Sequence, residues 1–267
     1  MKRYRVTDGK DFTLAKWDPA DTLAFAGGKA DARAELADMT ARLDDLQEKF
    51  YADNRHKLLV VLQGTDTSGK GGAIRKVFEG VNPAGVQVAS FKAPTEAELA
   101  HDFLWRVHPH APANGQIAIF DRSHYEDVLI VRVHDLVPPK RWRARYTHIR
   151  SFEKMLADEG TTIVKFFLHI SKDEQAERLR ARLDDPTKHW KFRVGDVEER
   201  ERWDDYQDAY EEAIRRTAAR HAPWIVVPAN RKWYRNLVIC QTLIDTLERL
   251  DLRYPESVDD LSGIVIE

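Results

Sequence analysis

The sequence predicts an α/β fold in which helices cover both faces of a parallel sheet. Short aliphatic runs alternate with longer segments whose apolar residues recur at helical spacing, which is the pattern of strands joined by crossover helices. The aliphatic runs are nearly continuous, as expected of strands buried on both faces. A glycine-rich segment, 64–72, lies between the first such run and the helix that follows it.

Bulk composition limits the function classes. The chain has 267 residues, of which 43% are hydrophobic, so it can bury a sizeable core. Lys and Arg total 42 against 44 Asp and Glu, and a net charge of −2 does not indicate binding to nucleic acid or membrane. The single cysteine, Cys240, excludes an intrachain disulfide. No apolar run approaches the ~20 residues of a membrane span. We therefore expect a cytoplasmic protein.

The N-terminal part of the chain is expected to be an extension. Residues 1 to about 30 are predicted to be irregular, because Pro19 and the pair Gly27 and Gly28 act as breakers. Residues 31–52 carry apolar side chains at helical spacing and predict an amphipathic helix. We assign residues 1–55 to this extension and 56–267 to the main domain.

The main domain is predicted to alternate between strands and helices. The expected strands are 57–63, 86–91, 116–120, 162–170 and 224–227. The expected helices are 69–79, 95–107, 139–158, 171–183, 197–220 and 232–250. Ser171 followed by Glu174 predicts a capping box at the start of one of them. The sequence contains no internal repeat, which favours one domain.

The segment Gly64-Thr65-Asp66-Thr67-Ser68-Gly69-Lys70-Gly71 is the strongest motif. It follows a buried strand and precedes a helix, the context in which backbone N–H groups cradle phosphate and a lysine neutralises its charge. A glycine turn with a solvated lysine is the alternative, which this context disfavours. Backbone flexibility at Gly64 and Gly69 suits such a cradle. Phosphate or nucleotide contacts are predicted for Gly64, Thr67, Ser68, Gly69 and Gly71, with Lys70 as a catalytic group.

Two aspartates indicate a metal ion. Gly71 stands where such loops usually carry the Ser or Thr that holds Mg²⁺, whereas Asp66 places a carboxylate inside the loop, which makes sense only if a cation separates it from phosphate. Asp121 ends a predicted strand, at the edge where a second metal-binding carboxylate belongs. We expect both to bind Mg²⁺, with Mn²⁺ as a substitute. Solvated turn aspartates are the alternative.

Arg122 follows Asp121 directly. It could form a bidentate phosphate contact, or it could pair with Glu126 or Asp127 on the surface. We count it among the catalytic candidates.

Positive charge is concentrated in residues 178–193. This segment has six basic residues and two acidic ones, so its net charge is +4 in a chain whose total is −2. It covers the end of a predicted helix and the following loop, which suits a lid that closes over phosphates. We expect Arg178, Arg182 and Lys188 to contact phosphate, Arg180 to lie on a solvated helix face, and the lid to span about 178–200.

Several strings resemble one known family. They are G-T-D-T-S-G-K-G-G at 64–72, V-N-P-A-G-V at 81–86, F-D-R-S-H-Y-E-D-V at 120–128, H-W-K-F-R at 189–193 and P-A-N-R-K-W-Y-R-N at 228–236. Together they resemble the polyphosphate kinase 2 family, from about Tyr4 to the C-terminus. Gly71, unusual for a phosphate-binding loop, is the pattern of that family.

The resemblance implies a P-loop, thymidylate-kinase-like fold of three α/β/α layers with a helical lid. It also implies Mg²⁺-dependent, reversible transfer of the terminal phosphoryl group of inorganic polyphosphate to AMP and ADP, giving ADP and ATP. By motif position, Asp66 and Asp121 are the metal and catalytic carboxylates, and Lys70 and Arg122 contact phosphate. The run 123–128 looks like the class III subgroup, which accepts AMP as well as ADP. A homo-oligomer, dimer or tetramer, is implied too.

Two other functions compete with this interpretation. An ATP-dependent nucleoside-monophosphate kinase would share the loop, the lid and the carboxylates, but Gly71 and the basic residues outside the lid disfavour it. A non-catalytic nucleotide or phosphate sensor is disfavoured because Asp66, Lys70 and Asp121 are all present. The sequence leaves open the preferred nucleotide, the direction of the reaction, the substrate that the loop cradles and the size of the oligomer.

Overall fold

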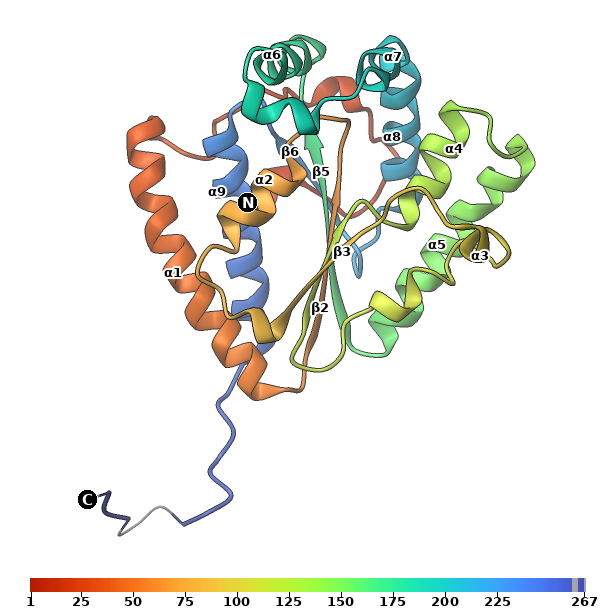
Figure 1. Ribbon diagram of the computed structural model, residues 1–267. Helices are drawn as coiled ribbons and strands as arrows, with labels where there is room; N and C mark the ends of the chain where they lie inside the picture. The colour runs from red at the N-terminus through yellow and green to blue at the C-terminus, as the bar shows by residue number, and fades with distance from the viewer. Residues whose placement is uncertain (261–263, 267) are drawn as a thin grey trace.

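A computed structural model describes residues 1–260 and 264–266 of the chain. In this described part, six strands form one sheet in the order β1-β6-β5-β2-β4-β3 (Figure 1). The strands are β1 (Arg5–Val6), β2 (Lys57–Gln63), β3 (Val86–Ser90), β4 (Ile117–Asp121), β5 (Thr161–His169) and β6 (Trp224–Pro228). All neighbours are parallel except β1, which runs antiparallel to β6.

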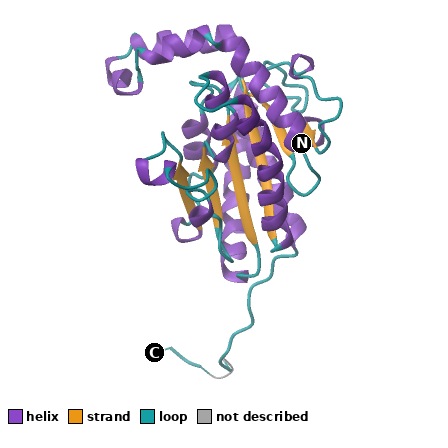
Figure 2. Cartoon of the chain, turned by 90° about the vertical axis from the view of Figure 1, so that its right-hand side faces the viewer, coloured by secondary structure: helices purple, strands orange, loops and turns teal. Residues whose placement is uncertain are grey.

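Helices cover both faces of the sheet, as Figures 1 and 2 show. One layer holds α1 (Lys29–Asp53), α2 (Lys70–Val77) and α9 (Lys232–Leu247), and the other holds α4 (Ile130–Val133), α5 (Pro139–Asp158) and α8 (Trp203–Thr217). The short α3 (Glu96–Leu99) lies in the connection from β3 to β4, and α6 (Lys172–Leu183) and α7 (Gly195–Glu201) lie above the carboxyl ends of the strands. The predicted three-layer α/β architecture is confirmed.

Strand β2 shows why the aliphatic runs are continuous. Leu58, Val60 and Leu62 pack into the core on the α1 and α9 side. Leu59 and Val61 pack into the core on the α5 and α8 side. Successive side chains point to opposite faces of a strand, so a strand covered on both faces must be apolar at every position.

Two predicted helices are wrong in extent. The segment 95–107 is helical only over α3, because the Asp102 carboxylate accepts a hydrogen bond from the Leu104 N–H at 2.9 Å and starts a separate turn. The segment 197–220 is not one helix but α7 and α8, which meet at Arg202 with ψ near +21°. The Arg202 side chain donates to the Val133 carbonyl at 2.9 Å, which fixes this break against α4.

Two further details differ from the prediction. Residues 1–30 contain β1, whose Arg5 and Val6 pair with Ile225 and Trp224 and cover the β6 edge. The predicted capping box of α6 forms only in part: Ser171 Oγ accepts from the Glu174 N–H at 3.2 Å, but the Ser171 N–H donates to Asn230 Oδ1 at 2.9 Å. The Glu174 carboxylate pairs with Arg178 instead.

The two ends of the chain differ in how they join the body. Leu43 and Phe50 of α1 share one apolar core with Leu237 and Leu243 of α9. The proposed boundary between residues 55 and 56 stays a prediction. After the 3₁₀ turn Glu248–Leu250, Leu252 still packs into the core and the Arg253 N–H donates to Asp53 Oδ2 at 2.6 Å. Beyond Arg253, the described chain runs away from the body in both views (Figures 1 and 2). None of the helices in the described residues has the length and hydropathy needed to cross a membrane.

Candidate phosphate-binding site

The loop from Gly64 to Gly69 connects β2 to α2 and depends on its two glycines. Gly64 has φ of +151° and Gly69 has φ of +97°, both in the region that favours glycine. A Cβ atom at Gly64 would lie 2.9 Å from the Leu168 carbonyl oxygen, and one at Gly69 would lie 2.1 Å from Arg235 Nη1. The loop conformation therefore requires glycine at both positions.

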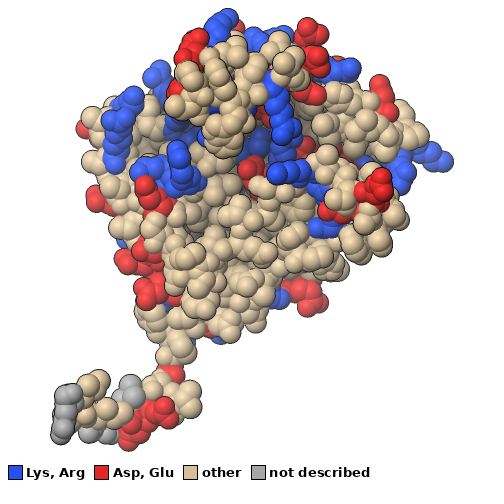
Figure 3. All heavy atoms as spheres, viewed as in Figure 1, with Lys and Arg blue, Asp and Glu red and all other residues tan. Residues whose placement is uncertain are grey.

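A cavity of about 520 Å³ opens beside this loop. It is lined by Asp66, Thr67, Gly69, Lys70, Gly71, Gly72, Arg75, Asp121, Arg122, Arg182, Trp190 and Lys191. Figure 3 shows Lys and Arg side chains gathered around a hollow below the α6 segment. Five basic residues against two acidic ones suit a polyanion that brings a cation with it.

Lys70 is almost fully buried in this cavity. Its Nζ donates to the Gly64 carbonyl at 2.7 Å and approaches the Thr65 carbonyl at 3.4 Å. Burial lowers the pKa of Lys70, the nearby Arg122 lowers it further, and Asp66 and Asp121 act in the opposite direction. A desolvated ammonium group gains more from a phosphate oxygen than a solvated one would.

Arg122 joins two carboxylates at the mouth of the site. Its Nη2 donates to Asp66 Oδ1 at 2.7 Å, and its Nη1 lies 3.4 Å from Glu126 Oε2. Burial acts to lower the pKa of Arg122, but Glu126 and Asp66 outweigh it and raise that pKa. Arg122 therefore forms the ion pair with Glu126 and also lines the cavity. Asp127, the other partner considered, pairs with Arg145 at 2.9 Å instead.

The carboxylates in the cavity suit a Mg²⁺ ion that takes its remaining ligands from substrate and water. Asp66 and Asp121 line one cavity, and in the described residues no three His, Cys, Asp or Glu side chains come together as a metal-binding group. Mg²⁺ usually takes one or two carboxylates, phosphate oxygens and water, so two carboxylates suffice. The buried hydroxyls of Thr67 and Ser68 have no hydrogen-bond partner in the described part of the molecule. They are further oxygen atoms within the loop, and Thr67 also lines the cavity.

Gly71 also lines the cavity, and no described atom lies within 4 Å of where its Cβ would be. Packing therefore does not force glycine at this position.

The three predicted phosphate contacts of the lid differ in where they lie relative to the cavity. Arg182 lines the cavity, donates to the Lys191 carbonyl at 3.1 Å and lies 3.5 Å from Asp196. Lys188 is half-exposed and pairs with Asp185 at 2.6 Å, outside the cavity lining. Arg178 is 8% exposed and lies against the loop from behind, with Nη1 2.9 Å from the carbonyl oxygens of Thr67 and Ser68. The structure does not bring Arg178 to the cavity.

Four residues near the loop were not singled out as site residues, although Trp190 and Lys191 fall inside the predicted lid. Arg75, Trp190 and Lys191 line the cavity, and Arg235 donates to the Gly69 carbonyl at 3.1 Å. Arg75 lies four residues, about one turn, after Gly71 on α2, so helical spacing from Gly71 was the available signal. Arg235 lies in the string 228–236, which supported the family resemblance but gave no role for this residue.

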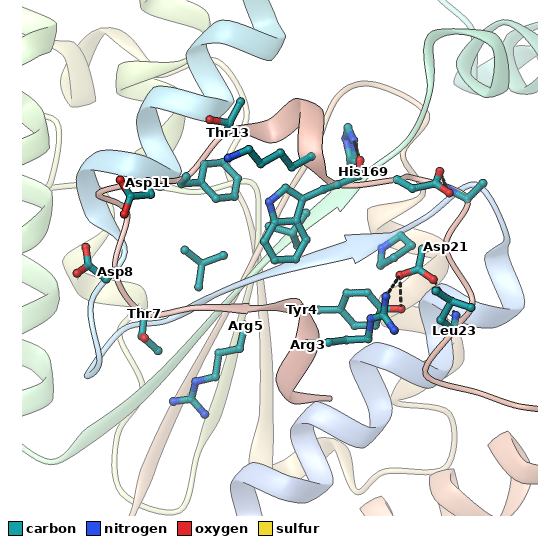
Figure 4. Close-up of a pocket in the computed structure, with 18 of the residues that line it drawn as sticks. Arg3, Tyr4, Arg5, Thr7, Asp8, Asp11, Thr13, Asp21, Leu23 and His169 are labelled. Carbon is teal, nitrogen blue, oxygen red and sulfur yellow. Dashed lines mark hydrogen bonds and ion pairs between the residues drawn. The ribbon is translucent and has the colours of Figure 1, made fainter.

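A larger cavity in the described residues lies elsewhere. It measures about 1020 Å³ and is bounded by the N-terminal segment with His169, Val226 and Pro228 (Figure 4). It contains no residue of the phosphate-binding loop. Four basic residues in its lining are balanced by four acidic ones, which gives no preference for an anion. We therefore place the candidate site in the smaller cavity, where the loop and the carboxylates meet.

Known proteins match the whole chain. The model of the polyphosphate kinase 2 (PPK2) family matches residues 27–255. An AMP/ADP-polyphosphate phosphotransferase of Meiothermus ruber is 59% identical over 267 residues, which is 100% of both chains. An ADP-polyphosphate phosphotransferase of Rhodopseudomonas palustris is 46% identical over 96% of this chain and 92% of that protein.

Solved structures agree. The crystal structure of polyphosphate kinase 2 from Arthrobacter aurescens superimposes with a TM-score of 0.94 at 49% identity, over 97% of this chain and 93% of that one. A family model that spans most of the sequence, together with relatives aligned end to end and a phosphate-binding loop built as described, shows that the chain belongs to the polyphosphate kinase 2 family.

Proposed function

We propose that this enzyme transfers the terminal phosphoryl group of inorganic polyphosphate to AMP and to ADP, giving ADP and ATP, in a reversible reaction that needs Mg²⁺ or Mn²⁺. The observation that carries the proposal is the cavity in which the loop, two carboxylates and five basic side chains meet. The Meiothermus ruber relative, named for AMP, ADP and polyphosphate, supports the choice of substrates because it aligns over the full length.

The roles follow from the requirements of the chemistry. Phosphoryl transfer depends on positioning and charge stabilisation, with little covalent chemistry for the protein. In our proposal the N–H groups around Gly64, Thr67, Ser68, Gly69 and Gly71 cradle phosphate oxygens. Lys70 and Arg122 neutralise charge on the transferring group. Asp66 and Asp121 would hold the metal ion, which would neutralise negative charge on the phosphate groups.

The lid in this proposal begins after Arg178. Arg182 and Lys191 already line the cavity, and Lys188 joins them when the segment closes over the phosphates. A long anionic chain also needs contacts outside the lid, which Arg75 supplies. A homo-oligomer and a cytoplasmic location remain predictions.

A turnover assay tests the function directly. Purified protein is incubated with AMP or ADP and polyphosphate, with and without Mg²⁺, and the nucleotide products are separated. We expect ADP and then ATP from AMP, and no product without a divalent cation. Product from an ATP-type donor with polyphosphate inert would instead identify a nucleoside-monophosphate kinase. Binding without turnover would identify a sensor.

A further inference from the structure

The carbonyl oxygens of the phosphate-binding loop are held by side chains from three helices. From Gly64 to Gly69, every carbonyl accepts at least one such hydrogen bond. The pairs are Lys70 with Gly64 at 2.7 Å and Thr65 at 3.4 Å, Gln175 with Asp66 at 3.2 Å, Arg178 with Thr67 and Ser68 at 2.9 Å each, and Arg235 with Gly69 at 3.1 Å. The donors come from α2, α6 and α9.

Arg178 is the centre of this arrangement. Besides the two loop carbonyls, its Nη2 donates to the carbonyls of Ala229 at 2.5 Å and Asn230 at 3.1 Å, and its Nε donates to Glu174 at 2.6 Å. A guanidinium group has five N–H donors, and all five are used. Arg178 therefore has no donor left for a phosphate oxygen unless one of these bonds breaks.

Arg235 holds the other end of the loop. It is 3% exposed, and the missing side chain of Gly69 makes room for its Nη1. Burial and the neighbouring Arg178 lower the pKa of Arg235 to about 10. Two buried guanidinium groups beside one loop are costly by themselves, and an anion on the other side of the loop offsets part of that cost.

Holding the carbonyls determines where the N–H groups point. Within one planar trans peptide, the C=O and the N–H point in opposite directions. Side-chain donors that bind the carbonyls of Asp66, Ser68 and Gly69 from behind therefore direct the N–H groups of Thr67, Gly69 and Lys70 the other way, toward the cavity. The Ser68 N–H is the exception, because it donates to the Thr65 carbonyl at 3.1 Å. The first N–H groups of α2 have no acceptor within the helix and are available as well. The result is a concave array of donors for an anion.

We propose that Arg178, Arg235 and Gln175, which we call the carbonyl clamp, are positioning residues that aim the N–H groups of the phosphate-binding loop without touching substrate. This inference rests on one part of the proposed function, namely that phosphate binds at this loop. The residues of α6 therefore have two different roles. Gln175 and Arg178 fix the helix to the loop, and Arg182, one turn later, is the first residue of α6 in the cavity.

The test compares Arg178→Lys and Arg178→Ala with wild-type enzyme, and Arg180→Ala, an exposed arginine of the same helix, is the matched control. Lysine keeps the charge but cannot reach two pairs of carbonyls with one ammonium group. We expect Arg178→Lys to lower kcat on the order of 10²-fold, because a small misplacement of binding groups costs that much. Affinity for inorganic tripolyphosphate, measured by calorimetry with Mg²⁺, should fall too. Arg180→Ala should stay within about twofold of wild type.

Hydrogen exchange separates a clamp from a direct phosphate contact. Amides of residues 64–72 should exchange faster in Arg178→Lys than in wild type, without any substrate present. Guanidinium at millimolar concentration should restore part of the activity of Arg178→Ala, and ethylammonium should not. If Arg178→Ala does not fold, Arg178→Lys and Arg235→Lys carry the same comparison.

Two results would overturn the clamp. One is a folded Arg178→Lys enzyme with wild-type turnover and wild-type loop exchange. The other is lost activity with unchanged loop exchange, since Arg178 would then act on the substrate directly. Failure of wild-type enzyme to bind tripolyphosphate would refute the proposed function instead, and the exchange measurement would still decide the clamp.

Discussion

Arg122 Nη2 lies 2.7 Å from Asp66 Oδ1, so an ion pair ties the phosphate-binding loop after β2 to the residue that follows β4. The two strands are parallel neighbours, with Leu62 in register with Asp121. Their carboxyl ends therefore meet at one edge of the sheet, where Asp66, Asp121 and Arg122 come together. In our proposal, a cation held by the two carboxylates would compete with Arg122 for Asp66 and would leave this guanidinium available for phosphate.

Asp66→Asn and Asp121→Asn should each lower kcat by on the order of 10²–10³, because each removes charge from a positioned electrostatic site. Both residues lie at the cavity surface, so the urea midpoint of unfolding should change little. Turnover at saturating Mg²⁺ is the measurement, and Asp184→Asn, an exposed acid of the basic segment, is the control. Wild-type turnover in either variant would remove that residue from the metal site.

Arg182→Ala should raise the KM for polyphosphate and lower kcat, because contacts made on closure serve both binding and transfer. The effect should shrink at high salt, since charge attraction is screened over ~8 Å at physiological ionic strength. Hydrogen exchange of residues 182–201 should slow when polyphosphate and a nucleotide are added together. Equal exchange in both states would mean that this segment is not a lid. Arg180→Ala again serves as the control.

The sheet could be predicted from the sequence because its strands are covered on both faces. The segment 57–63 has no polar position between Leu58 and Leu62, and it forms a strand with the predicted limits. Helix 139–158 was also predicted with its observed limits. Strand β1 could not be found, since two residues carry no periodicity. The end of α3 could not be found because the Asp102 carboxylate accepts a hydrogen bond from a nearby backbone N–H, and this bond competes with helix formation. The spacing of apolar residues does not reveal such a bond.

The site was predictable where its residues are contiguous. Asp66 and Lys70 lie in one loop, and Asp121 and Arg122 follow one strand, so the parallel arrangement brings them together. Arg178 was expected in a lid because it belongs to a basic cluster. Its actual contacts are with Thr67 and Ser68, about 110 residues earlier in the chain, and with Ala229 and Asn230. Composition cannot tell whether an arginine faces a cavity or a backbone.

Lys165→Met should destabilise the fold strongly. Lys165 is fully buried, and its Nζ donates to Glu153 Oε2 at 2.6 Å, Tyr125 Oη at 2.9 Å and the Thr217 carbonyl at 3.0 Å. Removing the ammonium group leaves the buried Glu153 carboxylate without its cation, which costs about 3–5 kcal/mol. Urea unfolding measures this loss. The double variant Lys165→Met with Glu153→Leu should recover part of it, and equal instability of the two would contradict the explanation.

His169 should make the fold less stable in mild acid. Its ring lies at the end of β5 (Figure 4). Its Nε2 is 3.1 Å from the Trp17 carbonyl oxygen in the N-terminal segment. Burial lowers the pKa of His169 to about 4, although the Trp17 carbonyl and Asp18 act in the opposite direction. The folded protein thus binds fewer protons than the unfolded chain between pH 6.5 and about 4. The stabilising contribution is complete above pH 6.5 and is lost as the pH falls through this window.

The variant His169→Gln keeps a polar side chain of similar size but cannot take up a proton in this range. Urea unfolding of both proteins should be followed from pH 7 down to pH 4, so that the titration of all other groups cancels in the difference. The free energy of unfolding of wild type should fall relative to the variant by up to roughly 3 kcal/mol, because each unit of pKa shift corresponds to about 1.4 kcal/mol. A difference that stays constant with pH would show that the His169 ring keeps its ordinary pKa in the folded protein, and that burial beside Trp17 does not exclude the charged form.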